Sequence, residues 1–177
     1  RQTQGLMRGF QLWINLPAAE KMSDPAYQEF TPEAIPEVLA DGTRVRVLAG
    51  QYSDQRGVIV DPHTELLYLD IRLQANQAFT TPLPASHRAF IYAYEGKVDI
   101  DGISLAQHSL TVLGQGESVR LQAGAEGASL ILVAGRPVGE PIVQYGPFVM
   151  NTREEIEQAM RDYRDGRLVR AKAAFPL

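Results

Sequence analysis

Cysteine is absent from the 177 residues, and histidine occurs only three times. Without cysteine the chain cannot form a disulfide framework, a thiolate zinc site, an iron–sulfur cluster or a cysteine nucleophile. The same absence agrees with a reducing compartment, so we expect a cytoplasmic protein. A metal site built on imidazoles would need nearly all of His63, His87 and His108.

Positive charge and long apolar runs are also scarce. The net charge is -4 and the pI is near 5.4, whereas nucleic-acid binding needs a clustered Lys/Arg surface, so we expect no direct nucleic-acid contact. No apolar run approaches the roughly 18 residues of a membrane span, so we expect no membrane partner. The opening residues carry neither an initiator Met nor a signal-peptide core, and we expect the chain to begin inside a longer protein.

Residues 43–137 contain short alternating segments separated by glycine turns. The segments that we expect as strands are 44–48, 65–73, 88–95, 98–100, 103–105, 109–113, 118–122 and 128–134. Asp101-Gly102, between two of them, is the strongest hairpin signal because both residues tolerate a positive φ. Many short strands without intervening helices predict an all-β fold, an antiparallel sandwich or barrel.

The alternation also suggests which side chains face the interior. Leu67, Leu69 and Ile71 recur at period two on one side of the segment 65–73. On the segment 88–95 the aromatic residues Phe90, Tyr92 and Tyr94 share one side, and Ala89, Ile91 and Ala93 share the other. We expect the aromatic set to face inward, together with the leucines and the isoleucine.

The two ends differ from this central part. Residues 9–16 alternate as a strand would, but no sheet partner is evident, and the proline-rich residues 18–42 resemble a linker. Thr152 to Glu155 form a capping box, and the helical spacing that follows predicts an amphipathic helix over about 152–165. The predicted organisation is thus a leftover strand region at 1–17, a linker at 18–42, a barrel at 43–137 and a C-terminal segment at 138–177.

Few residues carry a catalytic pattern. Ser86 adjoins His87, but neighbours on a strand point to opposite faces, which disfavours a catalytic triad. Asp99 and Asp101 share a strand face at the expected hairpin, where solvated turn residues are the simpler interpretation. A site formed by all three histidines stays open as an alternative, although no two of them occur as His-x-His.

Two long motifs resemble those of the pirin family of two-barrel cupin proteins. The sequence MRGFQLWINLP occupies positions 7–17, and YGPFVMNTREEI occupies positions 145–156. Between them, the tripeptide Tyr68-Leu69-Asp70 and the segment 89–96 also fit the family. The resemblance covers nearly the whole chain and implies a cupin-type double-stranded β-barrel, or jelly roll, with a C-terminal helix and one leftover strand of a first barrel.

The resemblance also implies where the metal lies. Pirin-like proteins hold iron or another divalent transition metal in their first barrel, through three His and one Glu that lie upstream of the opening motif. This chain therefore supplies no catalytic, cofactor-binding or metal-binding residue. In its own barrel the ligand positions of the general cupin pattern fall on Ala89, on the residues 82–85 and on Gly127, none of which offers a coordinating side chain.

Three functions are compatible with these residues. The first is the metal-free C-terminal half of a protein resembling quercetin 2,3-dioxygenase, with the N-terminal barrel as its partner and a flavonol-like substrate for the whole protein. The second is a protein-interaction or transcriptional-cofactor module, since the pirin family also includes nuclear cofactors that act through protein contacts. The third is a free-standing cupin isomerase or small-ligand binder, which would need polar groups converging inside the barrel.

Overall fold

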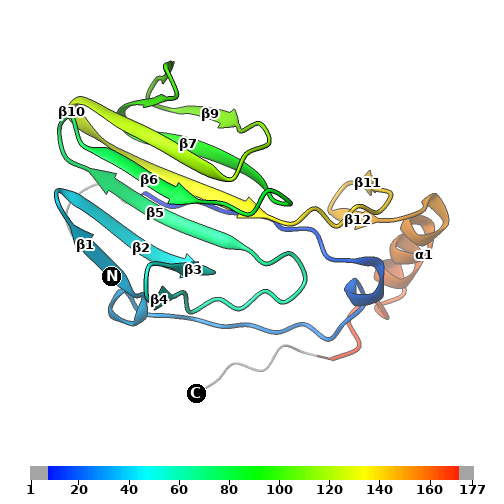
Figure 1. Ribbon diagram of the computed structural model, residues 1–177. Helices are drawn as coiled ribbons and strands as arrows, with labels where there is room; N and C mark the ends of the chain where they lie inside the picture. Colours follow the sequence, from blue (N-terminus) through cyan, green and yellow to red (C-terminus); the bar gives the residue numbers. More distant parts are fainter. Residues whose placement is uncertain (1–7, 172–177) are drawn as a thin grey trace. The chain divides into compact units, whose positions relative to one another are not determined.

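The computed structural model describes residues 8–171, and the chain divides into two compact units (Figure 1). One unit runs from Ala26 to Pro137. The other combines the described residues up to Pro25 with those from Val138 onward, so segments far apart in the sequence fold together. The described residues contain no helix long and apolar enough to cross a membrane.

The unit of residues 26–137 is built from antiparallel strands. Their bounds are β1 Glu37–Ala40, β2 Thr43–Ala49, β3 Gln51–Tyr52, β4 Gln55–Arg56, β5 Leu67–Leu73, β6 Ala78–Pro82, β7 Arg88–Ile100, β8 Ile103–Leu105, β9 Ser109–Val112 and β10 Ser118–Gly135. One sheet has the order β1-β2-β5-β10-β7-β8, with β6 also paired to β10 and β9 to β7. In Figure 1, β5, β10 and β7 run side by side. The predicted all-β class with antiparallel strands is confirmed.

The long strands β7 and β10 connect the parts of this sheet. The first part of β10 pairs with β6, its second part pairs with β5, and β7 accompanies both. Between the two parts the register shifts, and there Gly96 and Gly127 both have a positive φ. A Cβ atom on Gly96 would lie 2.1 Å from the carbonyl oxygen of Gly127, so only glycine permits this approach. The bulge lets one sheet turn a corner around its own core.

The core confirms the expected face of β5 and corrects that of β7. Leu67, Leu69 and Ile71 are buried, as predicted. On β7, however, the core cluster contains Ala89, Ile91 and Ala93, whereas Phe90 and Tyr92 alternate to the opposite face and are half-buried. The predicted inward position of the aromatic set is therefore wrong.

The register between strands explains this difference. Ile91 lies opposite Leu132 of β10, which in turn lies opposite Leu69 of β5, so one row of side chains crosses all three strands. Both faces of β7 are apolar, and period-two alternation cannot distinguish between them. Tyr94 is buried outside the core cluster, and its hydroxyl donates a hydrogen bond to Asp70 Oδ1 at 2.6 Å.

Several predicted strands occur with altered limits. The segments 88–95 and 98–100 merge into β7, and 118–122 and 128–134 merge into β10. The two-residue turn Asp101-Gly102 joins β7 to β8 with φ values of 50° and 85°, which confirms the hairpin. Strand β1 lies inside the segment 18–42 and was not predicted from the sequence, because its mostly exposed side chains show no alternation. The domain limits at 43 and 137 stay a prediction.

The second unit contains a short hairpin and one helix. Its elements are the 3-10 turn Ala18–Glu20, strands β11 Val143–Tyr145 and β12 Phe148–Met150, and helix α1 Arg153–Arg164. The predicted helix and its capping box are confirmed, since Thr152 Oγ1 accepts from the Glu155 N–H and the Glu155 carboxylate accepts from the Thr152 N–H. Buried Ile156 and Ala159 form its apolar face.

The strand expected at 9–16 is not present in the structure. No strand begins before β1 among the described residues, and Trp13 is 70% exposed. A strand is stabilised by hydrogen bonds to a neighbouring strand, and residues 9–16 have no such neighbour in the described chain. A further 3-10 turn, Pro32–Ala34, precedes β1 in the first unit.

Candidate functional site

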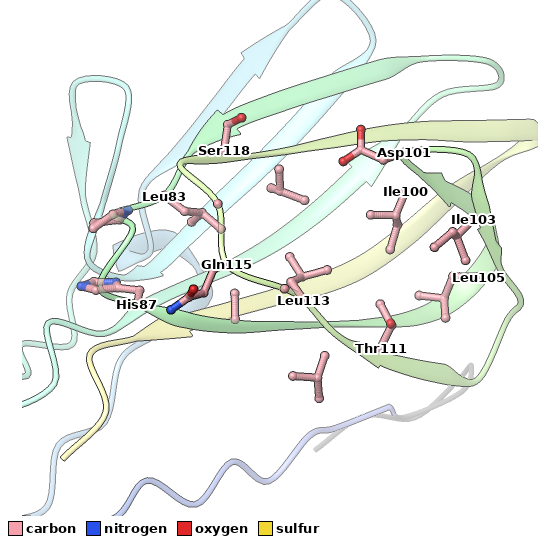
Figure 2. Close-up of a pocket in the computed structure, with 16 residues that line it drawn as sticks. Leu83, His87, Ile100, Asp101, Ile103, Leu105, Thr111, Leu113, Gln115 and Ser118 are labelled. Carbon is pink, nitrogen blue, oxygen red and sulfur yellow. The ribbon is translucent and has the colours of Figure 1, made fainter. Parts of the chain in front are cut away.

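A cavity of about 330 Å³ opens between β7, β8, β9 and the start of β10 (Figure 2). Its deeper wall is formed by the buried residues Leu83, Ala89, Ile100, Leu105 and Val119. The volume lies at the lower end of the about 300–1,000 Å³ that small-molecule sites occupy. This cavity is the candidate site.

The rim of the cavity is also largely apolar, although it faces solvent. Ile103 is 75% exposed and Val112 is 71% exposed, and both line the opening. Thr111, Gln115 and Ser118 add hydroxyl and amide groups to the same rim. The site thus combines an apolar interior with a few polar groups near its entrance, among which Asp101 is the acidic one.

His87 is the buried polar residue of this cavity. Only 8% of the residue is exposed, and its Nε2 atom lies 3.4 Å from a carboxylate oxygen of Glu65. Its other ring nitrogen, Nδ1, is buried and has no hydrogen-bond partner within the described part of the chain. Sequence reasoning did not find the His87–Glu65 pair, because 22 residues separate its members and no local pattern links them.

The other two histidines lie elsewhere and do not line the cavity. The backbone N–H of His63 donates to Asp61 in the loop before β5, and His108 occupies an exposed turn with a φ of 62°. Across residues 8–171 no group of three or more His, Asp or Glu side chains is arranged to hold a metal ion. The structure therefore does not assemble the three-histidine alternative.

The positions that the cupin pattern reserves for metal ligands fall partly in this cavity. Leu83, Pro84 and Ala89 line it, and their side chains carry no donor atom. Gly127 lies apart from the cavity, where a Cβ atom would come within 2.7 Å of the Leu73 carbonyl oxygen. The residues present do not fit a cupin-type metal centre.

The remaining catalytic candidates have structural roles or exposed positions. Asp99 Oδ1 accepts a hydrogen bond of 2.7 Å from the Gly102 N–H, so it stabilises the β7–β8 turn. Asp101 is exposed at the edge of the cavity, and the interpretation of both aspartates as turn residues is confirmed. Ser86 is exposed, and the hydrogen-bonded partner of the His87 ring is Glu65.

The pKa values of Tyr94 and Asp61 are shifted by the groups around them. Burial raises the pKa of Tyr94 to about 12, and the hydrogen bond to Asp70 and the charge of Asp70 act in the same direction, while Arg72 opposes them. At Asp61 burial would raise the pKa, but hydrogen bonds from the Thr64 hydroxyl and from backbone N–H groups lower it below its usual value. Asp70 alternates with the core residues of β5, so the Tyr94 network lies on the sheet face opposite the core.

Comparison with known proteins identifies the family. Residues 68–169 match the family model of the pirin C-terminal cupin domain. The chain belongs to the pirin family. This membership confirms the resemblance carried by the two terminal motifs.

The pirin relatives are similar over nearly all of this chain. A pirin-like protein of Caulobacter vibrioides is 44% identical over 168 residues, which cover 94% of this chain and 60% of the relative. Human Pirin is 39% identical over 164 residues, which cover 90% of this chain and 56% of the relative. The chain thus spans about 60% of the length of these relatives.

A solved structure supports the same fold. The crystal structure of a quercetin 2,3-dioxygenase from Acinetobacter baumannii superposes with a TM-score of 0.83 at 33% identity, covering 88% of this chain and 55% of that one. This pirin-family chain is therefore related to quercetin 2,3-dioxygenases.

The two motifs typical of pirins come together in the second unit. Lys21 Nζ donates to Asn15 Oδ1 at 2.6 Å, beside the opening motif. The Glu140 carboxylate accepts from the Ala18 N–H at 2.7 Å and from Asn151 Nδ2 at 2.8 Å, which joins the opening segment to the closing motif. The motifs therefore stabilise a local structure and contribute no residue to the cavity.

Proposed function

We propose that this chain is the metal-free second half of a pirin-type protein with two cupin barrels. A preceding barrel holds iron or another divalent transition metal and carries out a reaction resembling that of quercetin 2,3-dioxygenase, in which O₂ opens the ring of a flavonol. The preceding barrel is the main partner of this chain, and the whole protein is cytoplasmic. The chain by itself has no dioxygenase activity.

The composition of the cavity is the observation that carries this proposal. Transition metals in proteins need imidazole, carboxylate or thiolate donors. Where the cupin pattern expects such donors, the cavity has the alkyl side chains of Leu83, Pro84 and Ala89. A single histidine, His87, lines the cavity, and one imidazole does not make a closed metal site.

Strand β10 gives this half of the proposed protein a closed interior of its own. Residues 127–134 are all buried, including neighbours such as Ile131 and Leu132 that point to opposite faces of the sheet. A strand that is apolar on both faces is typical of a sheet covered on both sides. Both faces are buried within this chain itself, so β10 is an interior strand of the fold.

Metal analysis and oxygen uptake test the proposal. The 177-residue chain would be incubated with Fe²⁺, Mn²⁺, Co²⁺ or Ni²⁺ and desalted, and bound metal would be measured by mass spectrometry beside the full-length parent protein. We expect far less than one metal per chain and no quercetin-dependent oxygen uptake, whereas the parent binds one metal and consumes oxygen. One tightly bound metal per chain, or turnover without the first barrel, would contradict the assignment.

A partner pull-down added to these measurements separates the alternative function. A parent protein that binds metal but turns over no flavonol, and that retains a protein partner only when the metal is bound, would favour the interaction module. Oxygen uptake that depends on the flavonol and on the metal of the parent favours the dioxygenase half. Both outcomes can be measured on one preparation of the parent protein, and each favours a different function.

A further inference from the structure

The buried wall of the cavity in the 26–137 unit selects for an apolar ligand. It contains Leu83, Ile100, Leu105 and Val119, whose side chains offer no hydrogen bond to water. Water against such a wall makes few hydrogen bonds, so its displacement by an apolar group is favourable. A sugar-like or strongly polar molecule would lose its own hydrogen bonds to water and gain few in return.

Two large side chains extend this apolar surface to the entrance of the cavity. Ile103 of β8 and Val112 of β9 both line the cavity, although they are 75% and 71% exposed. Figure 2 shows Ile103 at the same end of the cavity as Ile100 and Leu105. Single exposed apolar residues are common on protein surfaces, but these two border a concave opening whose wall is also apolar. A ligand seated there would remove their surface from water and bind more tightly for that reason.

The volume of the cavity limits the size of the ligand. An apolar cavity of about 150 Å³ holds one benzene molecule. The cavity here has about 330 Å³, which gives room for two fused rings. A flavonol has three rings and several hydroxyl groups, so it is both larger and more polar than this space favours.

The charge at the entrance disfavours organic anions. Asp101 is exposed at the edge of the cavity, and no Lys or Arg occurs among the residues of the described chain that line it. A carboxylate near the opening repels an anion, and no neighbouring lysine or arginine offsets this repulsion. The hydroxyl groups of Thr111 and Ser118, also at the rim, are neutral. An uncharged ligand is therefore the one that the wall and the entrance both favour.

We propose that this cavity binds an uncharged, largely apolar molecule of about two fused rings. The rings lie against Ile100, Leu105 and Val119, and Ile103 and Val112 cover the edge that faces solvent. The ligand needs no metal, so the site is independent of the metal centre proposed for the preceding barrel. A flavonol is not its ligand.

Three probes test the proposal on the 177-residue chain. 2-Methylnaphthalene is the uncharged probe, 2-naphthoate has a carboxylate in place of the methyl group, and quercetin is a flavonol. Binding would be followed in ¹H–¹³C spectra of the Ile, Leu and Val methyl groups, because an aromatic ring shifts the resonances of the methyl groups that it contacts. We expect 2-methylnaphthalene to bind at least about tenfold more tightly than either of the other probes.

The methyl spectra also show where the probe lies. We expect 2-methylnaphthalene to shift the resonances of Ile100, Leu105 and Val119. Ile156 is the reference, because it lies in helix α1 of the other unit, and its resonance should not move.

A matched pair of valine substitutions locates the entrance of the site. Val112→Ser removes an exposed apolar side chain that lines the cavity, whereas Val60→Ser removes one that is 68% exposed and lies outside it. We expect about threefold to fivefold weaker binding of 2-methylnaphthalene to Val112→Ser and no change for Val60→Ser. Both side chains are mostly exposed, so neither substitution should disturb the core.

The variant Asp101→Asn tests the effect of charge. Asn tolerates the φ of 50° at this turn as Asp does, so the β7–β8 hairpin should be kept. The preference for 2-methylnaphthalene over 2-naphthoate should fall about threefold, because the repulsion of the anion is removed. The affinity for 2-methylnaphthalene itself should not change.

Three results would overturn the proposal. The first is a dissociation constant above about 1 mM for 2-methylnaphthalene. The second is tighter binding of 2-naphthoate or quercetin than of 2-methylnaphthalene. The third is an equal loss of affinity in Val112→Ser and Val60→Ser, which would place the bound probe outside the cavity.

Discussion

The hydrogen bond between Tyr94 and Asp70 offers a direct test of how the sheet face opposite the core is stabilised. The Tyr94 hydroxyl donates to Asp70 Oδ1 at 2.6 Å, and only 5% of Tyr94 is exposed. Tyr94→Phe removes the hydroxyl but keeps the ring. The variant therefore isolates the polar contribution of this residue.

The hydrogen bond sets the magnitude at neutral pH, and the pKa of Tyr94 sets the alkaline loss. Burial, together with the hydrogen bond and the charge of Asp70, raises the pKa of Tyr94 to about 12, against about 10 in the unfolded chain. Two pKa units correspond to about 2.7 kcal/mol, which is an upper limit on the stability lost when Tyr94 ionises, because Asp70 is half-buried and solvent screens the pair. Burial, the largest cause of the shift, disfavours the ionised form only, so at neutral pH the hydrogen bond alone sets the cost of losing the hydroxyl. We expect Tyr94→Phe to lower the free energy of unfolding by about 1–2 kcal/mol at neutral pH.

The pH dependence has a definite sign. A folded-state pKa above the unfolded value means that the stabilisation from Tyr94 is complete below about pH 10 and is lost as the pH rises to about 12. Urea unfolding at about pH 8 and about pH 11 should therefore show a smaller alkaline loss in Tyr94→Phe than in the natural sequence. Tyr145→Phe, at a position 62% exposed, is the control. An equal alkaline loss in Tyr94→Phe and in the natural sequence would refute the reasoning.

Three further predictions concern the backbone and the loops. Gly96→Ala should destabilise the chain by more than about 2 kcal/mol, because the added Cβ would meet the Gly127 carbonyl oxygen. Gly102→Ala is the control, since Gly102 has a similar positive φ but open space around it, and it should cost only about 1 kcal/mol. Equal losses of stability in urea unfolding would contradict the close approach of Gly96 to Gly127. Thr152→Ala should lower stability by about 1 kcal/mol and Thr152→Ser should not, as monitored by helical circular dichroism. Asp61→Asn should reduce the loss of unfolding free energy on acidification. The pKa of Asp61 is lowered in the folded chain, so the stabilisation by its carboxylate disappears as the pH falls through that folded-state pKa. An unchanged dependence of the unfolding free energy on acidic pH would disprove this role.

Features that depend on neighbouring residues were predictable from the sequence. The Asp101-Gly102 turn and the Thr152 capping box form through contacts within four residues, and both are confirmed. The strands from β5 to β10 were mostly recognised, because half-buried strands alternate with period two. Strand β6 was not recognised, since its buried face contains Thr81 beside Phe79 and shows no simple alternation of apolar and polar residues.

Features that depend on pairing between distant strands were not predictable. Phe90 and Ile91 both occupy apolar faces of β7, and only the register with β10 places Ile91 in the core. The alternation at 9–16 predicted a strand, but no neighbouring strand pairs with it among the described residues. In each case the local pattern permitted two states, and the presence or absence of a pairing strand far along the chain decided between them.

The amino-acid sequence by itself determined the all-β class, the positions of most strands, the capped helix and the resemblance to pirins, because these depend on local periodicity, turn residues and contiguous motifs. Only the tertiary structure decided which side of β7 faces inward and where the cavity opens. It also brought His87 and Glu65 together across 22 residues. The physical reason is that register between strands sets which distant side chains meet, and a shift of one residue would exchange the two faces.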